Sequence, residues 1–373
     1  MNKFLNEFID RGFFYQCTNK EELSNILDKK KINAYIGFDS TAPSLHVGSL
    51  LQIMCLRLLQ RYGHRPIVLL GGGTTRIGDP SGKEKTRKIL SEDKIERNIK
   101  NIKKVFNIFL KTDNPSLKPI YVNNFEWLGK LNYINFLREV GKHFTINKML
   151  SFDSVKLRLE REQSLSYMEF NYMILQAYDF LELNKKKNCL LQIGGSDQWG
   201  NIVNGVELIK RHTGKQVFGL TTPLITLASG TKMGKTEEGA VWLDPKLLSA
   251  YDYWQFWRNT DDNDVIRFIK MYTDKSIDEI ESIKNQDINK LKIILANEAT
   301  AMLHGKTASL NAEKTAKETF IDGIAGKDLP VINLKKKQGN KINILDLVLA
   351  SKLLTSKGEV RRAIKNNGIK IND

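Results

Sequence analysis

The chain has 373 residues, which exceeds the length of one ordinary domain and predicts two or three. Apolar residues make up 41% of the sequence, so a sizeable core can form, and this composition excludes a disordered or fibrous protein. The formal net charge of +16 at pH 7 fits either a polyanionic partner, such as nucleic acid, or a lysine-rich solvated surface.

The distribution of charge along the chain separates these two interpretations. Between residues 327 and 373 there are 11 lysines and arginines and 4 aspartates and glutamates, a difference of 7. Over the rest of the chain we interpret the positive charge as scattered surface lysine. Its concentration at the C-terminal end predicts a contact with nucleic acid.

The sequence lacks the patterns of metal sites, disulfides and membrane segments. Cys17, Cys55 and Cys189 are far apart and the five histidines do not cluster, so we expect no protein-held metal and no disulfide framework. Residues 1–10 mix acidic with apolar side chains, unlike signal or transit peptides, and no apolar run is long enough to span a bilayer. We therefore expect a cytoplasmic protein without a membrane segment.

The first elements in chain order predict a strand–helix–strand unit. Residues 34–38 have the pattern of a short buried strand, and residues 66–70 that of a second one. Between them lies an amphipathic helix whose apolar face consists of Leu51, Met54, Cys55, Leu58 and Leu59. This spacing predicts a parallel sheet with a right-handed crossover, in a Rossmann-like α/β fold.

A third strand is predicted at residues 189–193, followed by Gly194, Gly195 and another helix. In open parallel sheets, ligands bind beyond the carboxyl ends of the strands. The glycine-rich turns that follow the predicted strands are therefore the places where we expect chemistry.

The second half of the chain has a different pattern. Up to about Pro245, predicted strands and helices alternate and are separated by glycine-rich turns. After that point the apolar residues recur with helical periodicity, as at 265–272 and 291–295, which predicts a helical domain to about Phe320. Residues 323–341, which contain glycine, proline and three consecutive lysines, are typical of a linker. A small basic module closes the chain.

The turn after the first strand contains residues 45–49 (LHVGS). A helix that begins here directs free backbone N–H groups at an anion, and a glycine lets a nucleotide approach the backbone closely. By itself, a His-x-Gly sequence is more often an incidental turn than a functional one.

A second signal is the stretch 230–236 (GTKMGKT). Lys232 and Lys235 are three residues apart and flanked by glycines, which suits a loop that clamps phosphate oxygens. By itself, an exposed lysine-rich turn is the more common interpretation in so lysine-rich a sequence.

Together, and in this order, the two segments resemble the signatures of class I aminoacyl-tRNA synthetases, usually His-Ile-Gly-His and Lys-Met-Ser-Lys-Ser. Here they are His-Val-Gly-Ser and Lys-Met-Gly-Lys-Thr. The chain keeps His46, Lys232 and Lys235, and has Ser49 in place of the second histidine, where a hydroxyl still offers a donor and an acceptor. An adenylyltransferase could share the first signature.

Three further segments narrow the resemblance: 78–83 (GDPSGK), 194–201 (GGSDQWGN) and a helix at 169–180. On that helix Tyr172, Gln176 and Asp179 recur at i, i+4 and i+7 and form a polar stripe, which is equally typical of a solvated face. In combination, these features resemble tyrosyl-tRNA synthetases of bacterial type, from about residue 13 to the end of the chain.

This resemblance implies an enzyme that activates tyrosine with ATP to tyrosyl-adenylate, releases pyrophosphate, and transfers tyrosine to the 3′ end of tRNA(Tyr). The residues implied to be catalytic are His46, Lys83, Arg87, Lys232 and Lys235. Those implied to bind tyrosine are Tyr35, Asp79, Tyr172, Gln176, Asp179 and Gln198. Those implied to bind ATP are Gly37, Asp39, Thr41, His46, Gly48, Ser49, Gly195, Asp197, Lys232, Met233 and Lys235.

The implied chemistry explains these residue types. The tyrosine carboxylate is already ionised when it attacks the α-phosphate, so the reaction needs alignment and charge stabilisation rather than a general base. Mg²⁺ is expected to arrive with ATP, and no tightly bound cofactor is expected. Asp179 and Tyr35 are implied to hydrogen-bond the substrate hydroxyl, and Asp79 is implied to help hold its ammonium group.

The C-terminal segment resembles the small RNA-binding module of a ribosomal small-subunit protein and of many pseudouridine synthases. Its residues 356–364 (SKGEVRRAI) and 368–372 (GIKIN) carry the resemblance. The basic residues implied to contact RNA are Lys357, Arg361, Arg362 and Lys365, although a basic solvated helix is the alternative. The family's module continues into further strands beyond the point where this sequence stops, so we expect a module that is either naturally short or truncated.

The resemblance also implies an organisation and an oligomeric state. We expect a Rossmann-like catalytic domain at 1–225, the signature-lysine loop with a helical tRNA domain at 226–325, a linker at 326–340, and the small α+β module at 341–373. A homodimer is implied, with the apolar stretch 125–144 as its interface. Two other functions stay open: a tryptophanyl-tRNA synthetase, and a non-catalytic RNA-binding protein built on the same fold.

Overall fold

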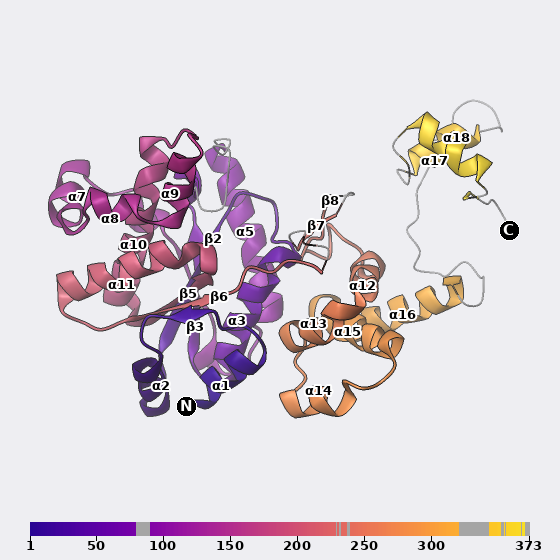
Figure 1. Cartoon of the computed structure of the whole chain (residues 1–373), viewed down its shortest axis with the longest axis horizontal. Coiled ribbons are helices and arrows are strands. Elements are labelled where there is room, and N and C mark those ends of the chain that lie inside the picture. Colours follow the sequence, from indigo (N-terminus) through magenta and orange to yellow (C-terminus); the bar gives the residue numbers. More distant parts are fainter. Residues whose placement is uncertain are drawn as a thin grey trace. The chain divides into compact units, whose positions relative to one another are not determined.

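The computed structural model describes residues 1–79, 90–228, 230, 233–236, 239–320, 343–351, 354, 356–366 and 368–369. The chain forms two compact units, Met1–Lys314 and Thr315–Asp373 (Figure 1). The linker predicted at 326–340 lies outside the described residues.

A six-stranded sheet organises the first unit, in the order β1-β6-β5-β2-β3-β4. All pairings are parallel except that of β1 with β6. The strands are β1 (Gln16–Cys17), β2 (Asn33–Asp39), β3 (Arg65–Gly71), β4 (Ile120–Asn123), β5 (Cys189–Gly195) and β6 (Phe218–Thr222). The expected parallel sheet and its first strand–helix–strand unit are confirmed.

Helices cover both faces of this sheet. Tyr35 and Phe38 on β2 point to opposite faces, because side chains alternate along a strand. The Tyr35 ring packs on Phe180 at 5.3 Å between centroids, and the Phe38 ring packs on Phe106 at 4.7 Å. Helix α10 (Tyr167–Lys187) and helix α5 (Glu92–Phe109) therefore lie on opposite sides of the sheet.

Helix α3 (Leu50–Arg61) lies on the same side as α5 and contacts β2, β3 and β5. Helix α11 (Trp199–Thr213) packs beside α10 and contacts β5 and β6. The other helices around the sheet are α1 (Lys3–Asp10), α2 (Lys20–Lys29), α4 (Thr74–Ile77), α6 (Phe125–Leu128), α7 (Tyr133–Glu139), α8 (Ile146–Leu150) and α9 (Asp153–Glu160).

Helix α10 has clear start and stop signals. A capping box joins Ser166 and Glu169 at its beginning, so the first free backbone N–H groups are satisfied. Asn188 adopts a left-handed conformation at its end, which asparagine tolerates well. Most of its central residues are buried, because the helix lies against both the sheet and α11.

Helices follow the sheet, as the periodicity after Pro245 predicts. Those within the first unit are α12 (Ala250–Arg258), α13 (Val265–Tyr272), α14 (Ile277–Ile283) and α15 (Ile288–His304), and α16 (Lys306–Phe320) begins in the first unit and ends in the second. A short two-stranded ribbon, β7 (Lys235–Thr236) with β8 (Gly239–Ala240), precedes them. Helix α13 packs on α3 of the sheet side and on α15.

The second unit contains α17 (Ile344–Ala350) and α18 (Lys357–Lys365), which pack against each other. Ser356 and Glu359 form a capping box at the start of α18, and Val360 is buried. Within the described parts of both units, no helix has the length and apolar character that crossing a membrane requires.

Candidate active site

A cavity of about 350 Å³ opens where β2, β3 and β5 end. Because these strands are parallel, the segments after their carboxyl ends converge at one edge of the sheet. Most of the residues expected to bind tyrosine or ATP line this cavity. They are Tyr35, Gly37, Asp39, Thr41, Gly48, Ser49, Asp79, Tyr172, Gln176, Asp179, Gly195, Asp197 and Gln198.

A buried carboxylate forms part of the cavity wall. Asp179 of α10 is only 1% exposed, and it accepts hydrogen bonds from the Trp127 indole N–H at 2.7 Å and from the Asn124 amide at 2.9 Å. Burial raises the pKa of Asp179 to about 7, although both hydrogen bonds act in the opposite direction. The polar stripe of α10 is thus buried at this position, not solvated.

The Tyr35 hydroxyl lies in the same wall and has no hydrogen-bond partner among the described residues. Its pKa is raised well above the usual value by burial, and further by the negative charge of Asp179. Buried hydroxyls are nearly always hydrogen-bonded, so one that borders a cavity is suited to a polar group of a ligand.

A chain of hydrogen bonds connects this wall to Asp39 at the end of β2. The Thr74 hydroxyl donates to Asp39 Oδ1 at 2.8 Å, and the Asn124 amide donates to Thr74 Oγ1 at 3.1 Å. From α10, the Tyr172 hydroxyl donates to Asp39 Oδ2 at 3.3 Å. The residues expected to hold tyrosine and those expected to hold ATP are therefore parts of one network.

A second set of hydrogen bonds joins three of the residues expected to hold tyrosine. The Gln198 amide donates to Asp79 Oδ2 at 3.0 Å. The amide of Asn201, on α11, donates to both Gln198 Oε1 and Gln176 Oε1 at 3.1 Å. These contacts fix the orientation of both glutamine amides near the carboxyl end of β5.

The two signature segments lie against each other. The His46 ring accepts a hydrogen bond from the Gly48 N–H at 3.0 Å, through Nδ1. A Cβ added at Gly48 would lie 2.8 Å from the Met233 carbonyl oxygen, and one added at Gly234 would lie 2.6 Å from His46 Nδ1. Both glycines therefore permit a close approach that no larger residue allows.

Comparisons with known proteins agree with this geometry. The family model of class I tRNA synthetases (W and Y) matches residues 27–321. A tyrosine–tRNA ligase of Pelagibacter ubique is 71% identical over all of this chain and 91% of its own length. A tyrosine–tRNA ligase of Zymomonas mobilis is 55% identical, over 100% and 92% of the two chains. The chain belongs to the bacterial-type tyrosyl-tRNA synthetase family.

The fold leads to the same family. The crystal structure of a C-terminally truncated mitochondrial tyrosyl-tRNA synthetase of Aspergillus nidulans superimposes with a TM-score of 0.77. Its sequence is 30% identical, and the match covers 85% of this chain and 94% of that one. The mixed α/β fold with a mainly parallel sheet is thus that of the class I synthetases.

Some of the family signature residues are not placed by the structure. Lys83, Arg87 and Lys232 lie outside the described residues, and of Lys235 only the backbone, in β7, is described. Conversely, the sequence patterns do not point to Thr74, Asn124, Trp127 or Asn201 as site residues, although all four contact residues of the site. The asparagine and tryptophan in 123–127 (NNFEW), directly after a strand, were the signal that could have found two of them.

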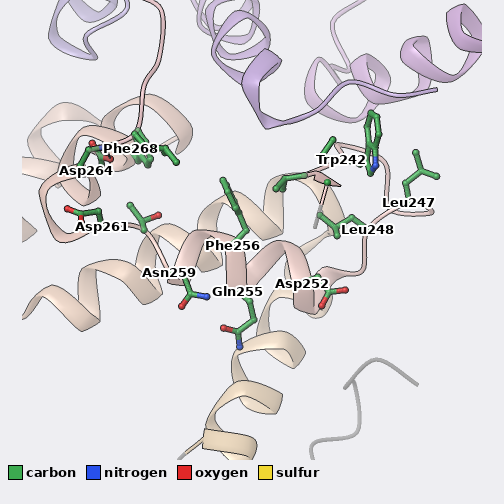
Figure 2. A pocket seen from close by; sticks show the side chains of 16 residues that line it. Trp242, Leu247, Leu248, Asp252, Gln255, Phe256, Asn259, Asp261, Asp264 and Phe268 are labelled. Atoms are coloured by element: carbon green, nitrogen blue, oxygen red, sulfur yellow. Dashed lines mark hydrogen bonds between the residues drawn. The ribbon is translucent and has the colours of Figure 1, made fainter. Parts of the chain in front are cut away.

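A larger cavity, of about 940 Å³, is lined by residues of 227–228, 239–242 and 247–248 and by residues of helices α12 and α13 and the loop between them (Figure 2). Its lining includes Trp242, Phe256 and Phe268, together with Asp252 and other polar residues. None of the residues expected from the family signatures lines it. We therefore assign the candidate active site to the smaller cavity, where those residues converge.

The raised pKa of Asp179 predicts a pH dependence of stability. The unfolded chain loses this proton near the ordinary aspartate pKa of 3.8, whereas the folded chain keeps it to about pH 7. Below pH 3.8 the group is protonated in both states. Between pH 3.8 and about 7 only the folded state binds the proton, so the contribution to stability falls across this range and is lost above it.

The Asp179→Asn variant carries no ionisable group at this position, so it does not show this loss of stability with rising pH. We expect the free energy of unfolding of the variant, relative to the wild type, to increase by about 1.4 kcal/mol for each pH unit between pH 5 and pH 7, and to stay level from there to pH 8. Urea unfolding at both pH values measures it. A constant difference between the two proteins would show that Asp179 ionises normally in the folded chain.

Proposed function

We propose that the chain is a tyrosine–tRNA ligase, which forms tyrosyl-adenylate from tyrosine and ATP and then transfers tyrosine to the 3′ end of tRNA(Tyr). The observation that carries this proposal is a cavity wall where the buried Asp179 carboxylate lies together with the Tyr35 hydroxyl, which lacks a partner among the described residues. A phenol, which both donates and accepts a hydrogen bond, supplies what this wall lacks. Family membership supports the same reaction.

Tyrosine is proposed to lie with its phenol at Tyr35 and Asp179. Its ammonium group then interacts with Asp79, Tyr172 and Gln176, and its carboxylate lies near Gln198. The pairing of Gln198 with Asp79 supports this arrangement, because it places an amide donor and a carboxylate side by side. An α-amino acid presents the complementary pair of charges.

ATP is proposed to lie across the ends of β2 and β5. Gly37, Asp39, Gly195 and Asp197 hold the adenosine, while Thr41, His46, Gly48, Ser49 and Met233 contact the remainder of the nucleotide. A Cβ at Gly195 would lie 2.6 Å from Asp197 Oδ1, so glycine keeps the backbone accessible at this point. Mg²⁺ enters with the nucleotide, because it prefers phosphate oxygens and retained water as ligands.

In the first step, a tyrosine carboxylate oxygen attacks the α-phosphorus of ATP, and the bond to the pyrophosphate oxygen breaks. His46, Lys83, Arg87, Lys232 and Lys235 stabilise the negative charge that develops on the phosphates. The close packing of the two signatures supports this assignment, because Met233 and Gly234, between the two lysines in the sequence, lie against Gly48 and His46. In the second step, a ribose hydroxyl of the tRNA attacks the acyl carbon and AMP leaves.

The rival substrate is tryptophan, since the matching family model covers both enzymes. An indole has a single N–H donor and no acceptor, so it would satisfy the Asp179 carboxylate but leave the Tyr35 hydroxyl without an acceptor for its proton. ATP–pyrophosphate exchange with each of the twenty amino acids decides between the two. Exchange with none would favour a non-catalytic RNA-binding protein.

Substitutions at the phenol end test the proposal. We expect Tyr35→Phe to leave stability unchanged or increased, because the deleted hydroxyl has no partner among the described residues, yet to lower kcat/KM for tyrosine. Asp179→Ala should lower kcat/KM for tyrosine further and weaken the preference for tyrosine over phenylalanine. Removal of one buried partner costs about 1–3 kcal/mol, roughly 5- to 150-fold in kcat/KM.

Pyrophosphate exchange with tyrosine and phenylalanine, together with thermal unfolding, measures both effects. Unaltered kinetics for tyrosine in both variants would refute the assignment of the phenol site.

A homodimer is proposed, with an interface that includes residues 125–144. Exposed large apolar side chains concentrate in α6 to α10 of the described chain. They are Phe125, Tyr133, Ile134, Leu137, Ile146, Leu150, Leu159 and Tyr167. A cluster of this kind is typical of a protein–protein interface, and a second copy of the chain is the partner that the family implies.

Ile134 of α7 is 68% exposed, the highest value in this cluster. We expect Ile134→Asp to shift the protein from dimer to monomer, because a charge in an apolar interface loses its hydration. Leu310 of α16 is 52% exposed outside the cluster, so Leu310→Asp is the matched control. Light scattering over a dilution series gives the masses. A monomeric wild type, or equal effects of both substitutions, would exclude this interface.

The C-terminal module at 341–373 is proposed to bind tRNA. In α18 the side chains of Lys357, Arg361, Arg362 and Lys365 are all exposed, while Val360 is buried. An exposed basic helix face supports contacts with phosphates. The domain division into 1–225, 226–325 and this module, and the cytoplasmic location, stay predictions.

Deletion of 341–373 should leave tyrosine-dependent pyrophosphate exchange nearly unchanged and weaken tRNA charging. The residues assigned to both small substrates precede this segment. The slope of log affinity for tRNA against log salt should become shallower by about 0.7–0.9 for each phosphate that the module neutralises in the full chain. The double variant Arg361→Gln, Arg362→Gln is a control that keeps the module folded. Equal affinities and equal slopes for all three proteins would mean that this module is inert.

A further inference from the structure

Two residues at the start of α13 hold the chain segment that leads into the signature-lysine loop. The Asp264 carboxylate accepts a hydrogen bond from the Ala228 N–H at 2.7 Å. The Arg267 guanidinium donates to the Thr226 carbonyl at 2.6 Å and forms an ion pair with Asp264 at 2.7 Å. The carboxylate and guanidinium thus hold the segment by its backbone at two points.

The environment of Asp264 favours a role in binding this segment. Asp264 occupies the N-cap position of α13, yet its side chain makes no capping hydrogen bond to its own helix. It is only 4% exposed and lines the larger cavity between the segment and α13 (Figure 2). Because this buried carboxylate does not cap α13 and instead accepts a hydrogen bond from the Ala228 N–H, it stabilises the position of the segment that contains Ala228.

Further along α13, a third residue contacts the other side of the same loop. The Tyr272 hydroxyl lies 3.2 Å from the Met233 sulfur, and both side chains are buried. Met233 also donates its backbone N–H to the Ile225 carbonyl at 3.4 Å. Helix α13 therefore contacts the loop both before and after the first signature lysine.

Helix α13 is itself fixed to the sheet part of the unit. Arg11 is 2% exposed, and it donates to the carbonyls of Lys270 at 2.7 Å, Thr273 at 3.0 Å and Lys275 at 2.7 Å. These are carbonyls at and just beyond the end of α13, where helices leave acceptors without partners. The loop is thus held by a helix whose position is defined relative to the cavity.

We propose that Asp264 and Arg267 are positioning residues for the signature-lysine loop, and that they set the rate of adenylate formation without contacting either substrate. The inference rests on the proposed function. Neither residue lines the candidate active site. Their effect passes through the placement of Met233 and Gly234, which lie between the two signature lysines in the sequence, against His46 and Gly48.

The test uses Asp264→Asn, Arg267→Met and Arg267→Lys in the full chain. Lys270→Met is the matched control, since Lys270 lies on the same helix and forms an ion pair with Glu281, at 3.5 Å, away from the loop. We expect Asp264→Asn and Arg267→Met to slow single-turnover adenylate formation about 10- to 100-fold, because misplaced charges stabilise the transition state less. Arg267→Lys should recover part of the rate, and Lys270→Met should match the wild type.

Two readouts separate positioning from general damage. The dissociation constant for tyrosine, measured without ATP, should change less than about twofold in every variant, because the loop does not contact tyrosine. In a Lys232→Ala, Lys235→Ala background, Asp264→Asn should have little further effect, because both loop charges that it positions are already gone. Independent structural damage would instead reduce tyrosine binding and multiply the two rate effects.

The outcomes also distinguish this inference from the proposed function. A wild-type protein that forms no adenylate with tyrosine overturns the proposed function. An active wild type whose variants retain its rate, or lose rate and tyrosine affinity together, overturns only the role of Asp264 and Arg267. Thermal unfolding identifies any variant that fails to fold, and the Arg267→Lys and Arg267→Met pair then carries the comparison.

Discussion

The parallel pairing of β2 with β3 on one side and with β5 on the other determines where chemistry can occur in this chain. Because the three strands run in one direction, the segments beyond their carboxyl ends converge at one edge of the sheet. Those segments carry Thr41, Asp79 and Asp197, which are widely separated in the sequence. The pairing of the strands thus determines where the cavity forms, and the side chains determine what it can bind.

Two polar groups in the wall of that cavity do not have all the hydrogen bonds that they can form. Burial of the Asp179 carboxylate opposes its ionisation, and the donors from Trp127 and Asn124 offset only part of this cost. The neighbouring Tyr35 hydroxyl lacks a partner within the described residues. Two incompletely paired groups on one wall favour a ligand that completes their hydrogen bonds. The same two groups therefore give the cavity its specificity for a ligand and lower the stability of the folded chain without one.

The sequence analysis predicted the features that depend on local pattern. Residues 66–70 form an unbroken apolar run, which is typical of a strand buried on both faces, and the structure has a strand there. The stripe on α10 was ambiguous, because period alone does not distinguish a solvated face from a cavity wall. Trp127 and Asn124 escaped prediction because they lie 52 and 55 residues from Asp179 in sequence. The roles of the expected site residues, including Lys83, Arg87 and Lys232, stay predictions.

A reaction that uses no general base depends on where fixed charges lie, and small displacements of such charges are costly. This requirement explains why buried polar contacts occur well outside the cavity. Arg11 binds carbonyls at the end of α13, more than 250 residues away in sequence, and Arg57 of α3 forms an ion pair with Asp274 just beyond that helix. Both arginines tie the helical part of the unit to the sheet part. Since α13 in turn contacts the signature-lysine loop, the placement of the loop depends on packing between the two parts as much as on the loop's own sequence.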